Sequence, residues 1–119
     1  MDVEETGLVE GENLRHADLR HRKLAGADLR FADLTAACLM GVDLTDASLD
    51  HADLSHADLT NAVLAGADLS DACLRRARLR NADLRGARLV NANLCGADFE
   101  GADITGADFT HARILGAVR

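Results

Sequence analysis

Two sets of side chains in this 119-residue sequence could carry out acid–base or metal chemistry. Imidazole is a frequent general base and metal ligand near neutral pH, and paired carboxylates can transfer protons or bind Ca²⁺. The candidates are five histidines and eleven regularly spaced aspartates: His16, His21, His51, His56 and His111, with Asp18, Asp28, Asp33, Asp43, Asp53, Asp58, Asp68, Asp83, Asp98, Asp103 and Asp108. Whether they do chemistry depends on which of them the fold brings together.

These residues belong to a five-residue repeat that occupies almost the whole chain. A large aliphatic residue or Phe recurs at every fifth position from Leu14 to Ile114. The residue two positions before each of them is small, and from position 17 to position 117 it is Ala except at Arg22 and Val42. The repeat never changes register, so the sequence contains no inserted loops.

The repeat is incompatible with a helix and favours very short extended segments. In a helix with 3.6 residues per turn, a five-residue step rotates each Leu by about 140° and scatters the Leu residues around the axis. Each Gly inside such a helix would also cost ~1 kcal/mol. In an extended segment, residues two apart share a face, so Ala and Leu point inward and the residue between them points outward. The sequence therefore predicts a solenoid of short strands joined by tight corners.

The second residue after each Leu has the composition of a tight turn. At positions 11 to 116 it is nine times Gly, three times Asn, twice Asp and five times His, and the exceptions are Phe31, Ala36 and Arg76. Gly, Asn, Asp and His are the residue types that best tolerate the positive φ that the third residue of a type II turn requires. All five histidines take this position, which predicts that they turn the chain and do not bind metal.

The pattern A(D/N)LXX resembles the repeat of the pentapeptide repeat protein family over about nine tenths of the chain. The resemblance implies an all-β fold, a right-handed quadrilateral β-helix with four pentapeptides per coil and a little over five coils. Residues twenty apart would then stack, no two histidines would stack directly, and the aspartates would spread over four faces without a cleft. We therefore predict no catalytic residue, no metal site and no cofactor, and a protein that is not an enzyme.

Composition limits the cellular context. Cys38, Cys73 and Cys95 are odd in number and lack a CxxC spacing, so we expect neither a disulfide framework nor a zinc site. The sequence has no apolar run of roughly 18 residues and no secretory signal, which predicts a soluble, cytoplasmic protein without membrane association. The net charge of −7 argues against direct nucleic-acid binding.

The two ends of the repeat differ from its middle. We predict an irregular lead-in over residues 1–13 and the β-helix over residues 14–119. The first coil is expected to form a ragged cap, because Glu12 and Arg22 take inward positions that hold Ala or Val later in the chain. Buried charges are costly, but at an open first coil these two can reach water or each other.

At the C-terminal end, Leu115 and Val118 take positions of the repeat that are predicted to point outward. The last coil is expected to have no segment that covers it. An uncovered solenoid edge invites pairing with another chain. We predict that the C-terminal coil forms a homodimer. The candidate residues for self-association are Phe109, Ile114, Leu115 and Val118.

Charge varies in bands along the repeat. Residues 31–74 contain eight acidic residues and no Lys or Arg, whereas residues 75–88 contain six Arg against Asp83. One interpretation is that the acidic band only provides solubility and blocks edge-to-edge aggregation. The other is that it binds a basic partner, through a candidate acidic belt that comprises Asp43, Asp46, Asp50, Asp53, Asp58, Asp68 and Asp71.

Two functions follow from these observations. The first is a non-enzymatic rigid scaffold that binds a protein partner. The second is implied by the resemblance, since some members of the family mimic DNA and bind DNA gyrase or topoisomerase IV, which confers quinolone resistance or self-protection against a toxin. The acidic charge fits a mimic of this kind, but the Arg band interrupts the continuous acidic stripe that a duplex mimic needs.

Overall fold

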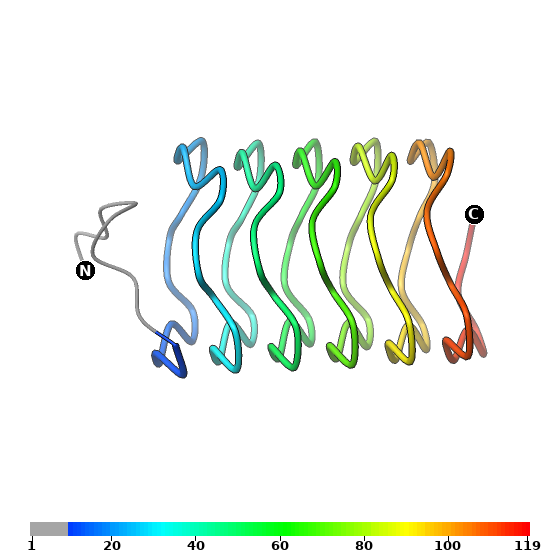
Figure 1. Ribbon diagram of the computed structural model, residues 1–119, viewed down its shortest axis with the longest axis horizontal. Coiled ribbons are helices and arrows are strands. Elements are labelled where there is room, and N and C mark those ends of the chain that lie inside the picture. Colours follow the sequence, from blue (N-terminus) through cyan, green and yellow to red (C-terminus); the bar gives the residue numbers. More distant parts are fainter. Residues whose placement is uncertain (1–9) are drawn as a thin grey trace.

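The chain winds into a stack of coils. The computed structural model describes residues 10–119, and the part of the predicted lead-in that covers residues 1–9 lies outside this range. The coils follow one another along a rod with extents of 34 × 20 × 19 Å, and the C-terminus lies at one end of it (Figure 1). The predicted right-handed quadrilateral β-helix is confirmed.

Single residues in parallel bridges connect the coils. Within residues 10–119 there is no strand longer than one bridged residue, and no helix that could span a membrane. The first bridge joins Asn13 to Asp33, the last joins Asp98 to Val118, and every bridge joins residues twenty apart. Because Asn13 is already bridged and residues 10–11 form a corner, the first coil begins slightly before Leu14.

Each corner is a β-turn with a left-handed residue. In the first complete corner, the N–H of Ala17 donates to the C=O of Leu14 at 3.1 Å. The corner residue has a φ between 57° and 76° at every position from Gly11 to Gly116. Phe31 and Arg76 adopt this conformation too, with φ of 61° and 58°, although large side chains rarely do.

The core consists of columns of Ala and Leu along the axis. Each Leu from Leu14 to Leu94 is at most 1 % exposed, and Phe99 continues this inward position at 7 %. Full burial of one such side chain contributes roughly 1.5–3 kcal/mol. No charged side chain among residues 10–119 is buried, and Glu12 and Arg22 are only half-buried in the first coil. The core leaves no room for a buried polar site, so chemistry would have to lie on the outside.

Candidate functional site

All eleven regularly spaced aspartates have the same structural task. In each, Oδ1 accepts a hydrogen bond from the backbone N–H two residues further along the chain, at 2.9–3.2 Å. That N–H belongs to the first residue of the next corner, so the carboxylate fixes the turn. From the sequence alone, these aspartates are expected only to face solvent, and the hydrogen bond to the corner N–H is not predicted. The sequence does contain a signal for this bond, because Asp recurs two residues before the first residue of a corner.

Neighbouring arginines lower the pKa of two of these carboxylates, those of Asp18 and Asp28. Nε and Nη2 of Arg20 donate to the two oxygens of Asp18, both at 2.8 Å, and this pair is the main reason that the pKa of Asp18 is lowered to about 2. Arg30 lowers the pKa of Asp28 to about 2 in the same way. A general acid at neutral pH needs a raised pKa, so these two aspartates offer no proton for catalysis.

The histidines lie at the corners, as their sequence position predicts. All five have positive φ, and the twenty-residue register places Ala36 between His16 and His56. Within residues 10–119, no three His, Cys, Asp or Glu side chains are arranged to hold a metal ion. The three cysteines are free and half-buried, and the Sγ of Cys73 lies 3.1 Å from the Oγ of Ser55.

The structure divides the acidic belt into two classes. In the first class, one carboxylate oxygen accepts a hydrogen bond from the N–H of a corner residue. This class comprises Asp43, Asp53, Asp58 and Asp68. The other three belt residues accept no such bond: Asp46 and Asp71 are themselves corner residues, and Asp50 directly precedes one. These three, Asp46, Asp50 and Asp71, are called the free belt acids below.

One corner combines free belt acids with an exposed aromatic ring. The ring of Phe31 stacks on that of His51, with centroids 4.7 Å apart and an interplanar angle of 11°. The two nitrogens of His51 lie 3.5 Å from Asp50 and 3.7 Å from Asp71. Phe31 is 52 % exposed and takes a conformation that bulky residues avoid. These four residues, Phe31, Asp50, His51 and Asp71, form what we call the His51 corner.

Sequence reasoning did not connect the residues of the His51 corner. Phe31 stood out as one of the three unusual corner residues, but its contact with His51 depends on the stacking of two coils. A bulky residue with positive φ is a signal for function, because backbone strain of this kind persists only where the surrounding structure fixes it.

The Arg band next to the belt is partly neutralised. The register places Arg78 between Asp58 and Asp98. The short ion pairs in this band are made by other arginines, however: Nε of Arg80 lies 2.6 Å from Asp98, and Nη2 of Arg85 lies 2.7 Å from Asp83. These exposed pairs contribute little to stability.

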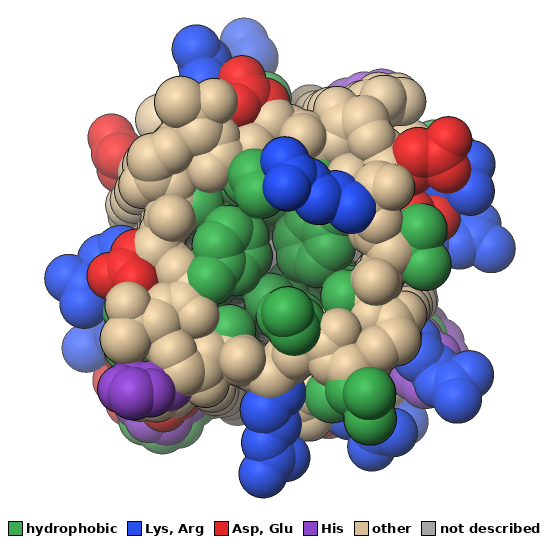
Figure 2. All heavy atoms as spheres, turned by 90° about the vertical axis from the view of Figure 1, so that its right-hand side faces the viewer, with side chains coloured by type: hydrophobic (Ala, Val, Ile, Leu, Met, Phe, Trp, Pro, Cys, Tyr) green, Lys and Arg blue, Asp and Glu red, His purple; other side chains and the backbone are tan. Residues whose placement is uncertain are grey.

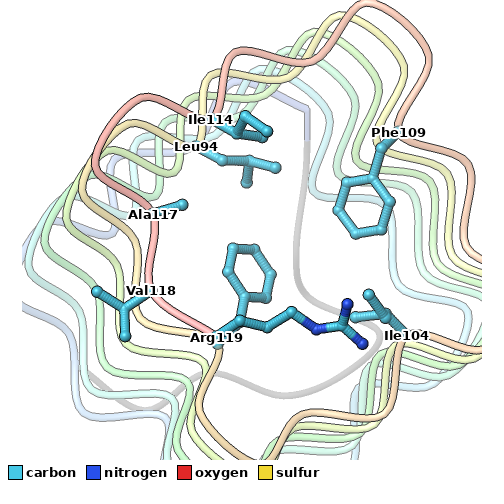
Figure 3. A pocket seen from close by; sticks show the side chains of 8 residues that line it. Leu94, Ile104, Phe109, Ile114, Ala117, Val118 and Arg119 are labelled. Atoms are coloured by element: carbon cyan, nitrogen blue, oxygen red, sulfur yellow. The ribbon is translucent and has the colours of Figure 1, made fainter.

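The C-terminal end of the rod carries an apolar hollow. Its volume is about 350 Å³. Apolar side chains fill the centre of this end, one basic side chain lies over them, and other charged side chains lie around the edge (Figure 2). Among the predicted self-association residues, Phe109, Ile114 and Val118 line the hollow, whereas Leu115 does not. Leu115 is 84 % exposed. The hollow is completed by Leu94, Phe99, Ile104, Ala117 and Arg119 (Figure 3).

Several solved structures are similar to this chain. A pentapeptide repeat protein from the Arabidopsis thaliana thylakoid lumen is 35 % identical, with 86 % of this chain and 68 % of that chain aligned and a TM-score of 0.50. QnrB1, a plasmid-mediated fluoroquinolone resistance protein, is 16 % identical over 92 % of this chain and 68 % of its own, with a TM-score of 0.72. This likeness to QnrB1 shows the fold alone.

A third similar structure is a pentapeptide repeat protein from Nostoc PCC 7120, which is 36 % identical over 81 % of this chain and 78 % of its own, with a TM-score of 0.45. No curated protein matches the chain. The family model "Pentapeptide repeats" matches residues 13–48, 37–76 and 77–114, with eight copies. The repeat, the stacked square coils and this match agree: the chain belongs to the pentapeptide repeat family.

Proposed function

We propose that this protein is a non-enzymatic scaffold that binds a partner protein with a cationic surface at the His51 corner and the free belt acids. The observation that carries the proposal is the combination of an exposed, strained Phe31 with carboxylates that accept no corner N–H. Residues 31–74 contain no Lys or Arg, although Arg30, directly before this segment, acts on Asp50 through its charge.

The chemistry of the His51 corner suits an arginine-rich segment. A guanidinium group can form bidentate hydrogen bonds with a carboxylate and can also stack on an aromatic ring. Phe31 offers such a ring, and Asp50 and Asp71 lie on either side of the His51 on which it stacks. Aromatic anchors surrounded by weaker contacts are typical binding hot spots.

The fold supports recognition by a rigid surface. The belt residues lie on coils whose backbone groups are bonded above and below, for example the Asp53 N–H to the Ala32 C=O at 2.9 Å and the Leu34 N–H to the Asp53 C=O at 2.7 Å. A surface that is ordered before binding loses little conformational entropy on binding. The partner therefore meets carboxylates that are already in place.

A peptide titration tests this proposal. The probe is a synthetic peptide of alternating Arg and Leu, compared with the same peptide carrying Glu in place of Arg, and the readout is the amide spectrum of the ¹⁵N-labelled protein. We expect the Arg peptide alone to shift amides around Phe31, His51 and Asp71. Shifts confined to another coil, or equal shifts with both peptides, would contradict the proposal.

A matched pair of variants shows whether peptide binding depends on where the negative charges lie or only on the net charge of the protein. The triple variant D46N/D50N/D71N removes three charges from the free belt acids, and E100Q/D103N/D108N removes three charges outside the belt. Because all six substitutions keep the side-chain shape, we expect at least tenfold weaker binding from the first variant and less than threefold from the second. Equal losses would indicate that only net charge matters.

A second candidate is DNA mimicry toward a type II topoisomerase. Its support is the acidic belt on a rod-shaped protein, together with the fold that the chain shares with QnrB1. The Arg band at residues 75–88 opposes it, because a mimic of the duplex needs uninterrupted negative charge. The test is DNA supercoiling by purified gyrase, with and without a fluoroquinolone. Absence of inhibition and of protection at micromolar protein would eliminate this candidate.

A further inference from the structure

We propose that a hollow in the Arg band binds a phosphate group, held by the guanidinium groups of Arg78 and Arg80. The hollow has a volume of about 310 Å³, and four residues line it: Thr60, Arg78, Arg80 and Asp98. We call it the Arg78 hollow. Three observations carry the proposal: an arginine without a partner, a second arginine held beside it, and carboxylates that are already occupied.

The Arg78 hollow extends over three coils on one side of the rod. Arg78 is bridged to Asp58 in the preceding coil and to Asp98 in the following coil. Thr60 and Arg80 are twenty residues apart, so they stack at the corner where this side ends. That corner is ten residues, or half a coil, from the corner that contains His51. The two sites therefore lie at opposite corners of the rod, and this inference is independent of the proposed function.

Arg78 has no partner because other donors occupy the acids next to it. Within residues 10–119, its guanidinium group forms no hydrogen bond and no ion pair. Oδ1 of Asp58 accepts from the N–H and the hydroxyl of Thr60, at 3.0 and 2.6 Å. Oδ2 of Asp98 accepts from Nε of Arg80 at 2.6 Å, and its Oδ1 accepts a backbone N–H at 3.0 Å. Arg78 is exposed, so its five N–H donors are available to a ligand.

Arg80 is held in place beside this free guanidinium. Its Nε contacts Asp98, and its Nη2 lies 3.3 Å from Glu100. The hydrogen bond from Arg80 is the main reason that the pKa of Asp98 is lowered, and the charge of Arg78 also lowers it. The charges of both arginines therefore act on the same part of the hollow, where a ligand would meet them together.

Two arginines in this arrangement suit a phosphate group better than a carboxylate. A guanidinium group forms two parallel hydrogen bonds with either anion. The two oxygens of a carboxylate are then satisfied by one arginine, whereas a phosphate ester has three acceptor oxygens and nearly two negative charges at neutral pH. The second charge also offsets repulsion by Asp98. A phosphate group can thus use Arg78 fully and share Arg80 with Asp98.

The neighbouring corner adds positive charge. Arg75 and Arg76 directly precede the side that carries Arg78, and both are exposed. Neither side chain forms an ion pair within the part of the chain that the structure describes. Arg76 has a φ of 58°, a conformation that large residues rarely adopt. Backbone strain of this kind is often found at binding sites.

Arg88 provides a matched control for Arg78. It takes the same position in the repeat, is exposed, and is bridged to an aspartate on either side, on which its charge acts. However, the residue two positions later is Val90, where Arg78 is followed by Arg80. Arg88 also does not line the Arg78 hollow. We expect an exposed arginine without a second arginine beside it to bind phosphate much less.

Titration with inorganic phosphate tests the proposal. The readout is the Nε–Hε signals of the arginines in the ¹⁵N-labelled protein, with NaCl used to keep the ionic strength constant. We expect saturable shifts for Arg78 and Arg80, with a millimolar dissociation constant because water competes at this exposed site. R78Q should weaken binding at least tenfold and R88Q less than twofold, since hydrogen bonds to charged groups are the strong ones. Amide spectra show that each variant is folded.

Substitution of Asp98 should have the opposite effect. D98N removes the one negative charge that lines the hollow, releases Arg80 from an ion pair and keeps an acceptor for the backbone N–H. We expect it to tighten phosphate binding at least twofold. A cation or a neutral ligand would instead lose a contact with Asp98 and bind more weakly.

A second titration distinguishes two sources of the phosphate group. The probes are the tripeptide Gly-phosphoserine-Gly and its unphosphorylated form. Binding of the phosphorylated peptide at least threefold tighter than that of inorganic phosphate would assign the hollow to a phosphorylated side chain. Equal binding of the two would assign it to free phosphate, and the unphosphorylated peptide should not bind in either case.

Three results would overturn the inference. The first is the absence of saturable shifts at Arg78 and Arg80 up to about 50 mM phosphate. The second is an equal loss of binding in R78Q and R88Q, which would mean that phosphate responds only to net charge. The third is weaker phosphate binding by D98N. None of these substitutions touches the His51 corner, so the Arg peptide tests the proposed function separately.

Discussion

The imidazole of His21 occupies the place where a Cβ on Gly41 would lie. The space available to the side chain at one corner therefore depends on which residue takes the stacked corner in the next coil. The same relationship joins Asp46 to Gly66 and Asn81 to Gly101. Each pair is twenty residues apart, in one corner column. At these corners Gly therefore leaves room for the side chain of the neighbouring coil and also adopts positive φ easily, so a larger residue there would have to displace that side chain.

Alanine substitutions at two corner glycines should separate the two requirements. Gly41 and Gly86 have the same φ of 66°, but no atom lies within 4 Å of a Cβ built on Gly86. Both variants carry the strain of a left-handed Ala, and G41A must also displace the His21 ring. We expect G41A to lose about 0.5–1.5 kcal/mol more unfolding free energy than G86A, the cost of an off-rotamer side chain. Urea denaturation measures the difference.

A double-mutant cycle provides the control. In the background of H21A the obstruction is absent, so G41A and G86A should then cost the same within about 0.5 kcal/mol. If G41A remains the more destabilising variant without the imidazole, the cause lies in the backbone and not in the contact between neighbouring corners.

The paired aspartates predict a defined response to acid. The pKa values of Asp18 and Asp28 are about 2 in the folded state, below the value of about 3.9 in an unfolded chain. Between these values the unfolded state binds more protons, so their stabilising contribution is complete above about pH 4 and disappears as the pH falls toward about 2. NMR titration of the side-chain carboxyl carbons should give midpoints near 2 for both.

Removal of one arginine tests the cause of the lowered pKa. In R20Q the hydrogen bonds from the guanidinium to Asp18 are lost, so the pKa of Asp18 should rise toward 3.8 while that of Asp28 stays near 2. If both midpoints stay at their wild-type values, the corner N–H and not the arginine determines them.

The corner-fixing bond of the aspartates should depend on an acceptor and not on charge. Oδ1 of Asp43 accepts from the Thr45 N–H at 3.0 Å and from the Thr45 hydroxyl at 2.6 Å. Asn keeps an acceptor at this place and Ala does not. We expect D43A to lose about 1 kcal/mol of unfolding free energy and D43N less than half of that, as measured by urea denaturation. Equal losses would assign the effect to the negative charge.

Much of the fold is predictable because its rules are local. Inward Ala and Leu, outward Asp and left-handed corners each follow from residues within one pentapeptide, and the structure confirms them even at Phe31 and Arg76. The number of residues per coil does not follow from five residues and came from the resemblance to a family. With that register, His51 falls between Phe31 and Asp71 in one corner column, so the position of His51 in this column is predictable from the sequence.

The sequence register does not predict which charged side chains form ion pairs on the surface. The twenty-residue register places Arg78 between two aspartates, yet Arg80, two residues further along the chain, makes the 2.6 Å contact with Asp98. Long side chains reach beyond their own column, so the column does not decide the ion pair. The predicted cytoplasmic location and the identity of the partner remain predictions, because no geometric feature of the rod depends on them.

The most direct test of the central claim is the effect of Phe31 on binding and on stability together. Asn adopts positive φ more readily than Phe, so F31N relieves the backbone and loses only the stacking on His51. We predict that F31N changes the unfolding free energy by less than about 1 kcal/mol and weakens calorimetric binding of the Arg–Leu peptide at least fivefold. Binding of wild-type strength by F31N would contradict the assignment of the His51 corner as the partner-binding site.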